Sequence, residues 1–266
     1  MVLVMNKGQY SGSVGIASSE SGIIASITEY TGNNFNGELH YHKNAHISFV
    51  LHGGCAEKKQ DRYERLPGML THYSACEPHQ VLGVAPFSKH INIELEPEFF
   101  NTYEVSDSTL HTAVAKNPES KFLMIKLYAD LVAYDAHSMT SIKMTLLNLV
   151  GQTVRWQNKC DVPQWVKLVH AYLMDNWDTF PSLQQLSIVA GVHPVHVSKY
   201  FPLYFACTLG EFMRKIKIDK AIRLIKFTNE PLTSIAYMCG FTDQSHFIRS
   251  FKLHTGYSPS AFRKLS

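Results

Sequence analysis

The sequence predicts an α+β fold, in which a small antiparallel β-barrel is followed by helices and then by an all-helical C-terminal domain. Three observations predict it. Short runs of β-forming residues, separated by glycine and proline turns, fill residues 22–95. Apolar residues recur at helical spacing over residues 98–156. Further on, a pattern of two short helices around a glycine occurs twice, with its turns at Gly191 and Gly240.

Four runs in the first part of the chain are typical of β-strands: residues 23–27, 46–51, 68–73 and 90–95. They are short, rich in β-forming residues, and separated by turn residues, as in a small barrel or sandwich. We therefore assign residues 1–106 to a barrel domain.

Helical periodicity replaces the strand pattern after the barrel. The apolar positions with helical spacing are Phe122, Ile125, Leu127, Leu131, Ile142, Leu146, Leu149 and Val150. These two stripes offer more apolar surface than one barrel needs to cover, so we expect residues 107–156 to form a dimerisation segment. The polar segment 157–163 ends in proline and is the predicted linker to the last domain, residues 164–266.

The repeated pattern near the C-terminus is typical of helix-turn-helix units, in which the second helix lies in the major groove of DNA. The units are expected at about residues 183–205 and 232–255, bridged by one basic amphipathic helix over residues 210–227. In the first unit, Ser182 and Gln185 have the spacing of a capping box. Pro202 lacks an N–H group, so we expect the first recognition helix to end or kink near this position.

Charge and composition favour a DNA-binding role for the second half of the chain. The formal net charge is +3, but residues 162–266 carry 12 Lys or Arg against 6 Asp or Glu. An excess of basic residues in one half indicates a nucleic-acid partner at that end. There is no apolar run of about 18 residues and no signal-peptide pattern. The 5 cysteines form no C-x-x-C motif, which is typical of a cytoplasmic protein.

The second unit continues with a run of residues in a distinctive order: Ile235, Ala236, Cys239, Gly240, Phe241, Gln244, Ser245, Phe247, Phe251, Lys252, Gly256, Ser258, Pro259, Phe262 and Arg263. This run resembles the AraC/XylS family of bacterial transcription regulators. The resemblance is close over residues 162–265, and elsewhere it is one of architecture. It implies a cytoplasmic, sequence-specific regulator that is associated with the nucleoid when bound to DNA. It further implies activation with RNA polymerase, a homodimer, and a cupin-like N-terminal domain that binds a small effector.

The resemblance also places the residues that read DNA. On the first recognition helix, the family pattern puts Val195, Ser198 and Lys199 outward. On the second, Thr242 is the expected cap, and the outward residues are Gln244, Ser245, His246 and Arg249, with Lys252 as a phosphate contact. Glutamine can pair with adenine and arginine with guanine. We therefore expect the second helix to be the better reader.

Four histidines mark a candidate site in the barrel: His40, His42, His46 and His79. Their arrangement is similar to the short motifs of cupin barrels, except that His46 stands where metal-binding cupins have an acidic residue. We expect an organic effector, with these histidines on its polar rim and Phe49 and Leu51 in its wall. A metal site and a purely structural role remain alternatives. No cofactor and no enzymatic activity are expected, although a cupin metalloprotein or enzyme fused to a DNA-binding domain is a second possibility.

Overall fold

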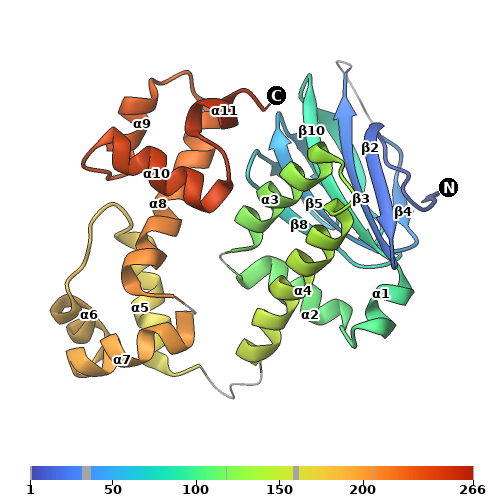
Figure 1. The fold of residues 1–266 in the computed structure, drawn as a ribbon. Coiled ribbons are helices and arrows are strands. Elements are labelled where there is room, and N and C mark those ends of the chain that lie inside the picture. The colour runs from blue at the N-terminus through green and yellow to red at the C-terminus, as the bar shows by residue number, and fades with distance from the viewer. Residues whose placement is uncertain (1, 32–36, 118, 158–161, 206, 266) are drawn as a thin grey trace. The chain divides into compact units, whose positions relative to one another are not determined.

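The computed structural model describes most of the chain (Figure 1). The described residues are 2–31, 37–117, 119–157, 162–205 and 207–265. They divide into two compact units, residues 1–154 with 261–266 and residues 155–260. None of the helices in the described residues is long and apolar enough to span a bilayer.

The strands of the N-terminal unit form two antiparallel sheets and one parallel pair. The five-stranded sheet has the order β2 (Ser13–Glu20), β3 (Ile23–Tyr30), β10 (Ser88–Leu95), β5 (Ala45–His52) and β8 (Leu70–Tyr73). The three-stranded sheet has the order β7 (Arg62–Arg65), β6 (Cys55–Lys58) and β9 (Gln80–Val84). β1 (Leu3–Met5) pairs in parallel with β4 (His40–His42). The predicted α+β fold is confirmed, but within the described residues no strand pairing closes the sheets into a barrel.

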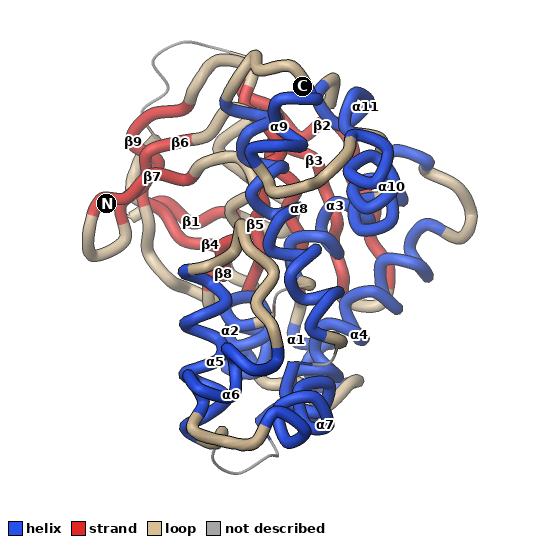
Figure 2. Tube along the Cα trace, turned by 90° about the vertical axis from the view of Figure 1, so that its left-hand side faces the viewer, coloured by secondary structure: helices blue, strands red, loops and turns tan. Residues whose placement is uncertain are grey.

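The five-stranded sheet is buried on both faces, and the two faces differ in chemistry. Strand alternation puts Ile47, Phe49 and Leu51 of β5 on an apolar face, and α3 packs against β5. The other face carries buried polar side chains: Ser26, Thr28, His46, Ser48, His90, Asn92 and Glu94. Figure 2 shows α3 and α4 on one side of this sheet and β6, β7 and β9 on the other. The interior between the two sheets is therefore polar.

Helices follow the strands, with bounds α1 (Pro97–Thr102), α2 (Asp107–Lys116), α3 (Ser120–Ala133) and α4 (Ser138–Gln157). The carboxylate of Asp107, at the start of α2, accepts a 2.6 Å hydrogen bond from Ser74 and lies 2.9 Å from His72 Nε2. The eight apolar stripe residues predicted for a dimer interface are buried within this unit. These stripes therefore cover apolar surface of their own unit, and the dimerisation segment at residues 107–156 stays a prediction.

The second unit is entirely helical. Its helices are α5 (Gln164–Asp175), α6 (Leu183–Ala190), α7 (Pro194–Phe205), α8 (Leu209–Phe227), α9 (Leu232–Met238) and α10 (Gln244–Thr255). α11 (Pro259–Arg263) is the last helix, and its residues from Ala261 onward group with the first unit. The predicted capping box of α6 is present, with Gln185 N donating to Ser182 Oγ and Gln185 Oε1 accepting from Ser182 N. The predicted linker, residues 157–163, lies mostly outside the described residues.

The first recognition helix was expected to end or kink near Pro202. α7 does not end near Phe201 but continues through Pro202 to Phe205. The rings of Phe201 and Phe205 stack 4.1 Å apart in the core, and this packing offsets the hydrogen bond that proline removes. The predicted linking helix is present as α8, which contacts α7 as well as α9 and α10. Its buried residues therefore extend beyond the predicted side and include Met213, Ile218 and Ile222.

Candidate nucleic-acid interface and histidine cluster

The second helix-turn-helix unit is ordered by its turn and by aromatic packing. Gly240 has a φ of 70°, a left-handed conformation that favours glycine. Phe247 and Phe251 of α10 are fully buried, and the Phe247 ring lies 5.2 Å from that of Phe241. The helix cap is Asp243, whose Oδ1 accepts a 2.7 Å hydrogen bond from His246 N. The prediction of Thr242 as the cap was wrong by one residue, since α10 begins at Gln244.

The outer side of α10 carries a row of polar side chains. Gln244, Ser245, Arg249 and Lys252 are exposed. His246 is only half-buried, because its ring lies edge-on to Phe241 with centroids 5.4 Å apart. The exposed residues offer amide, hydroxyl and guanidinium groups, which can form hydrogen bonds with base edges or phosphates.

The outer side of α7 is chemically poorer. Val195, Ser198 and Lys199 are all exposed. Val195 can contact only a methyl group, and Lys199 Nζ lies 5.3 Å from the centroid of the Tyr200 ring. The two helices thus present unequal sets of groups to a ligand.

In the N-terminal unit, three of the four predicted histidines meet at one point. His40, His42 and His79 are buried and offer ring nitrogens within 4.8 Å of one another. Nδ1 of His40 lies 2.8 Å from Glu38 O, and Nδ1 of His79 lies 3.1 Å from Glu77 O. Because a carbonyl accepts a hydrogen bond, each Nδ1 carries the proton, and each Nε2 is left with a free lone pair.

His46 and two tyrosines surround this cluster. The ring of His46 lies 4.3 Å from that of His42 and stacks at 4.3 Å on Tyr73. Tyr10 lies 5.1 Å from the His42 ring. Burial, with nearby His79 and His40, lowers the pKa of His42 to about 3. Burial also lowers the pKa of His79, to about 4, so these imidazoles are neutral at pH 7.

A buried ion pair extends the polar interior toward the three-stranded sheet. Glu57 accepts a 2.7 Å hydrogen bond from Tyr73 Oη and lies 3.5 Å from Arg65 Nη1. Arg65 also donates to Ser48 O at 3.0 Å. Within the described residues, Glu57 Oε1, Tyr63 Oη and Arg65 Nε have no hydrogen-bond partner. These three residues were not predicted from the sequence, although their inward positions in two short strands were a usable signal.

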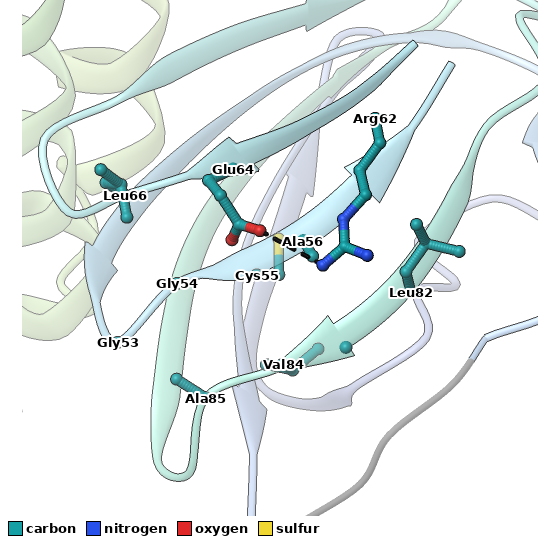
Figure 3. A pocket seen from close by; sticks show the side chains of 11 residues that line it. Gly53, Gly54, Cys55, Ala56, Arg62, Glu64, Leu66, Leu82, Val84 and Ala85 are labelled. Carbon is teal, nitrogen blue, oxygen red and sulfur yellow. Dashed lines mark ion pairs between the residues drawn. The ribbon is translucent and has the colours of Figure 1, made fainter. Parts of the chain in front are cut away.

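The expected apolar wall was wrong. Phe49 and Leu51 are buried on the face of β5 opposite His46, because an odd separation along a strand reverses the direction of the side chain. A pocket of about 600 Å³ lies elsewhere, on the three-stranded sheet (Figure 3). Arg62 and Glu64, both on β7, form an ion pair at 3.6 Å in its lining. None of the four histidines lines this pocket.

Comparisons with known proteins agree with the geometry of the helical unit. Residues 186–265 match the family described as a helix-turn-helix domain. The chain is 24% identical over 236 residues to the probable transcriptional regulator LumQ of Photobacterium leiognathi, covering 84% of this chain and 91% of that protein. It is 28% identical over 226 residues to the transcriptional activator RhaS of an Enterobacter species, covering 81% and 78%.

A third relative matches only in part. The bifunctional transcriptional activator and DNA repair enzyme AdaA of Bacillus subtilis is 28% identical over 103 residues, which is 39% of this chain. This chain spans about half, 49%, of the length of that protein. Together, the fold and these matches define a DNA-binding transcription regulator of the helix-turn-helix class. Within that class, the chain is similar to regulators of the AraC/XylS type.

Proposed function

We propose that this regulator reads its DNA site mainly through α10 and activates transcription when its N-terminal unit binds a small polar ligand. The exposed polar row on α10 carries the first part of the proposal. Arg249 and Gln244 can each form paired hydrogen bonds with a base, and each such pair is worth about 1–3 kcal/mol of discrimination. Lys252 adds a phosphate contact, which positions the helix without specifying sequence. On α7, Ser198 and Val195 supply little base discrimination.

Selection of DNA sites tests this proposal. Duplexes enriched from a randomised library by the intact chain serve as probes for titrations at several salt concentrations. Arg249→Ala and Gln244→Ala should bring affinity for the enriched duplex close to that for random duplex, whereas Ser198→Ala should leave the preference intact. About six phosphate contacts would give a slope of about −5 in log affinity against log salt. A Ser198 variant that lost preference as fully as the Arg249 variant would refute this ranking.

The polar face of the five-stranded sheet supports a polar effector. An apolar ligand would leave Glu57 Oε1 and Arg65 Nε without hydrogen-bond partners, which is costly, while a ligand with hydrogen-bonding groups could satisfy these two atoms. The four histidines, His40, His42, His46 and His79, border the same interior. A thermal-shift screen should therefore find its ligands among sugars, amino acids and small carboxylates, and Arg65→Met should remove the shift. Stabilisation by long-chain fatty acids alone would refute the polar character of the site.

The convergence of three imidazoles favours a metal ion as a second candidate ligand. His40, His42 and His79 would be its ligands, and zinc binds imidazole nitrogen at about 2.0–2.1 Å. The backbone carbonyls on two Nδ1 atoms provide the outer contacts that orient metal-binding histidines. The ion would provide a charged centre that ties β4 to the turn before β9. Elemental analysis of protein purified without a histidine tag should show one zinc or other transition metal per chain, lost in His42→Ala and retained in His137→Ala.

We further propose that the regulator acts as a homodimer in the bacterial cytoplasm and contacts RNA polymerase at its promoter. The helical segment still has exposed apolar residues, of which Val132 is 49% and Met144 is 61% exposed. These residues, and not the buried stripes, are the candidate contacts. Sedimentation at micromolar concentration should show a dimer, and Met144→Asp should shift it to a monomer. A wild-type monomer both with and without DNA would contradict the proposal.

A further inference from the structure

The helix that links the two DNA-binding units uses two lysines for internal contacts. Lys217 Nζ donates a 2.7 Å hydrogen bond to the carbonyl oxygen of Gly240 and lies 6.0 Å from the centroid of the Phe241 ring. Lys220 Nζ lies 5.2 Å from the ring of Trp177, in the loop after α5. Residues three positions apart share one face of a helix. One face of α8 therefore contacts both the turn of the second helix-turn-helix unit and the loop that precedes the first.

The turn at Gly240 is closely packed as well as left-handed. A Cβ atom placed there would lie 2.7 Å from Asp178 O and 3.0 Å from Lys217 Nζ. The loop after α5, the turn of the second unit and Lys217 therefore meet at one place. Gly191, the equivalent turn of the first unit, has a similar φ of 64°, but a Cβ there would meet nothing within 4 Å. Tertiary contacts hold the second turn and leave the first one open.

The position of the turn determines where the second recognition helix begins. Gly240 precedes the cap, Asp243, by three residues, and α10 begins directly after it. A shift of this turn would move Gln244 and Arg249 together. Lys217 itself is half-buried, so its ammonium group has given up part of its hydration for the Gly240 carbonyl. A lysine that served only to attract phosphate would keep its ammonium group in water and would not need the Gly240 carbonyl as a partner.

We propose that Lys217 is a positioning residue for DNA recognition. By holding the Gly240 carbonyl against the loop after α5, Lys217 fixes α10 relative to the first helix-turn-helix unit. It thereby sets the distance between the two half-sites that one chain reads. Because two recognition helices on one face of DNA read positions about one helical turn apart, a fixed geometry accepts one spacing and disfavours its neighbours.

The experiment compares Lys217→Met with Lys167→Met in the intact chain. Lys167 is exposed on α5, so its replacement removes the same charge from the same unit without touching the turn. The probe is a duplex enriched by the wild-type chain, together with versions whose two half-sites are one base pair closer or further apart. Wild type and Lys167→Met should bind the altered spacings about tenfold or more weakly. Lys217→Met should bind the original duplex more weakly, and its affinities for the three spacings should fall within about threefold of one another.

Lys217→Arg, which keeps a cationic donor, should restore the wild-type spacing preference, and Lys217→Gln should not. This pair decides the question if the methionine variant does not fold. An equal loss of affinity at all three spacings, which a general loss of stability would produce, overturns the proposal, as does an unchanged preference. The proposal rests on two-helix reading of DNA. If the wild-type chain enriched no duplex, the proposed DNA-binding function itself would be overturned. If the wild-type chain enriched a site and Lys217→Met kept the same spacing preference, only the role of Lys217 would be overturned.

Discussion

The buried pair of Glu57 and Arg65 offers a sharp test of the polar interior. Glu57 is 0% exposed and Arg65 is 4% exposed, and their charged atoms are 3.5 Å apart. Glu57→Gln keeps an oxygen that can accept from Tyr73 Oη but removes the negative charge. At an effective dielectric constant of about 20, the lost attraction is about 5 kcal/mol. Breaking a buried pair on one side costs about 3–5 kcal/mol in measured cases, because the remaining charge is left uncompensated.

Hydrogen exchange in the N-terminal unit measures that cost. Amides of β10, at the centre of the five-stranded sheet, report opening of this unit, and each 1.4 kcal/mol changes protection tenfold. Glu57→Gln should reduce their protection at least about hundredfold. The double variant Glu57→Gln with Arg65→Met should recover much of this loss, since no charge is then buried alone. Glu64→Gln is the matched control, because Glu64 forms an exposed ion pair with Arg62 and exposed pairs contribute little. A double variant as unstable as the single one would refute the reasoning.

Three further predictions concern single side chains. Asp243→Ala should lower the melting temperature of the helical unit by removing an N-cap worth about 1 kcal/mol, and a melting temperature equal to that of the wild type would contradict this. Asp243→Asn keeps the cap and should bind random duplex more tightly, because a negative charge is gone. Gly240→Ala should destabilise the chain more than Gly191→Ala in thermal melts, since both strain a left-handed turn but only Gly240 lacks space; equal losses would show that the packing is unimportant. Burial, assisted by Arg65, holds the pKa of His90 well below its usual 6.5. The unfolded state therefore binds a proton that the folded state does not, and the free energy of unfolding falls by about 1.4 kcal/mol per pH unit as pH drops below about 6.5. Urea titrations should show a shallower fall for His90→Leu, and identical slopes would refute the assignment.

The parts of the structure that follow local rules were predictable from the sequence. Glycine in a left-handed turn and a serine–glutamine capping box depend on neighbouring residues, so the turns at Gly191 and Gly240 and the start of α6 could be placed in advance. Strand alternation likewise brought His40 and His42 to one side. The cap of α10 was misplaced by one residue, because Thr242 and Asp243 are both good caps and only the surrounding structure selects one.

Features that depend on distant contacts could not be predicted in the same way. The polar interior forms because β6 and β7 turn Glu57 and Arg65 toward a face of another sheet, and the pairing of sheets is not written in any short segment. The same applies to α7, which continues through Pro202 because Phe205 packs on Phe201 and Phe212. Lys217 looked like one more basic residue of a linking helix, since its partner carbonyl is 23 residues away in the chain.

Enrichment of DNA by the intact chain tests the central claim, that α10 is the principal reader of sequence, most directly. Wild type and Arg249→Ala are each allowed to select duplexes from the same randomised library, and the enriched sequences are compared position by position. We expect the wild-type chain to enrich one site with two segments about one helical turn apart. In the Arg249→Ala selection, the strong preference should disappear in the segment that α10 reads, leaving only the weak preference of the segment that α7 reads. Identical enriched sites from both proteins would contradict the account.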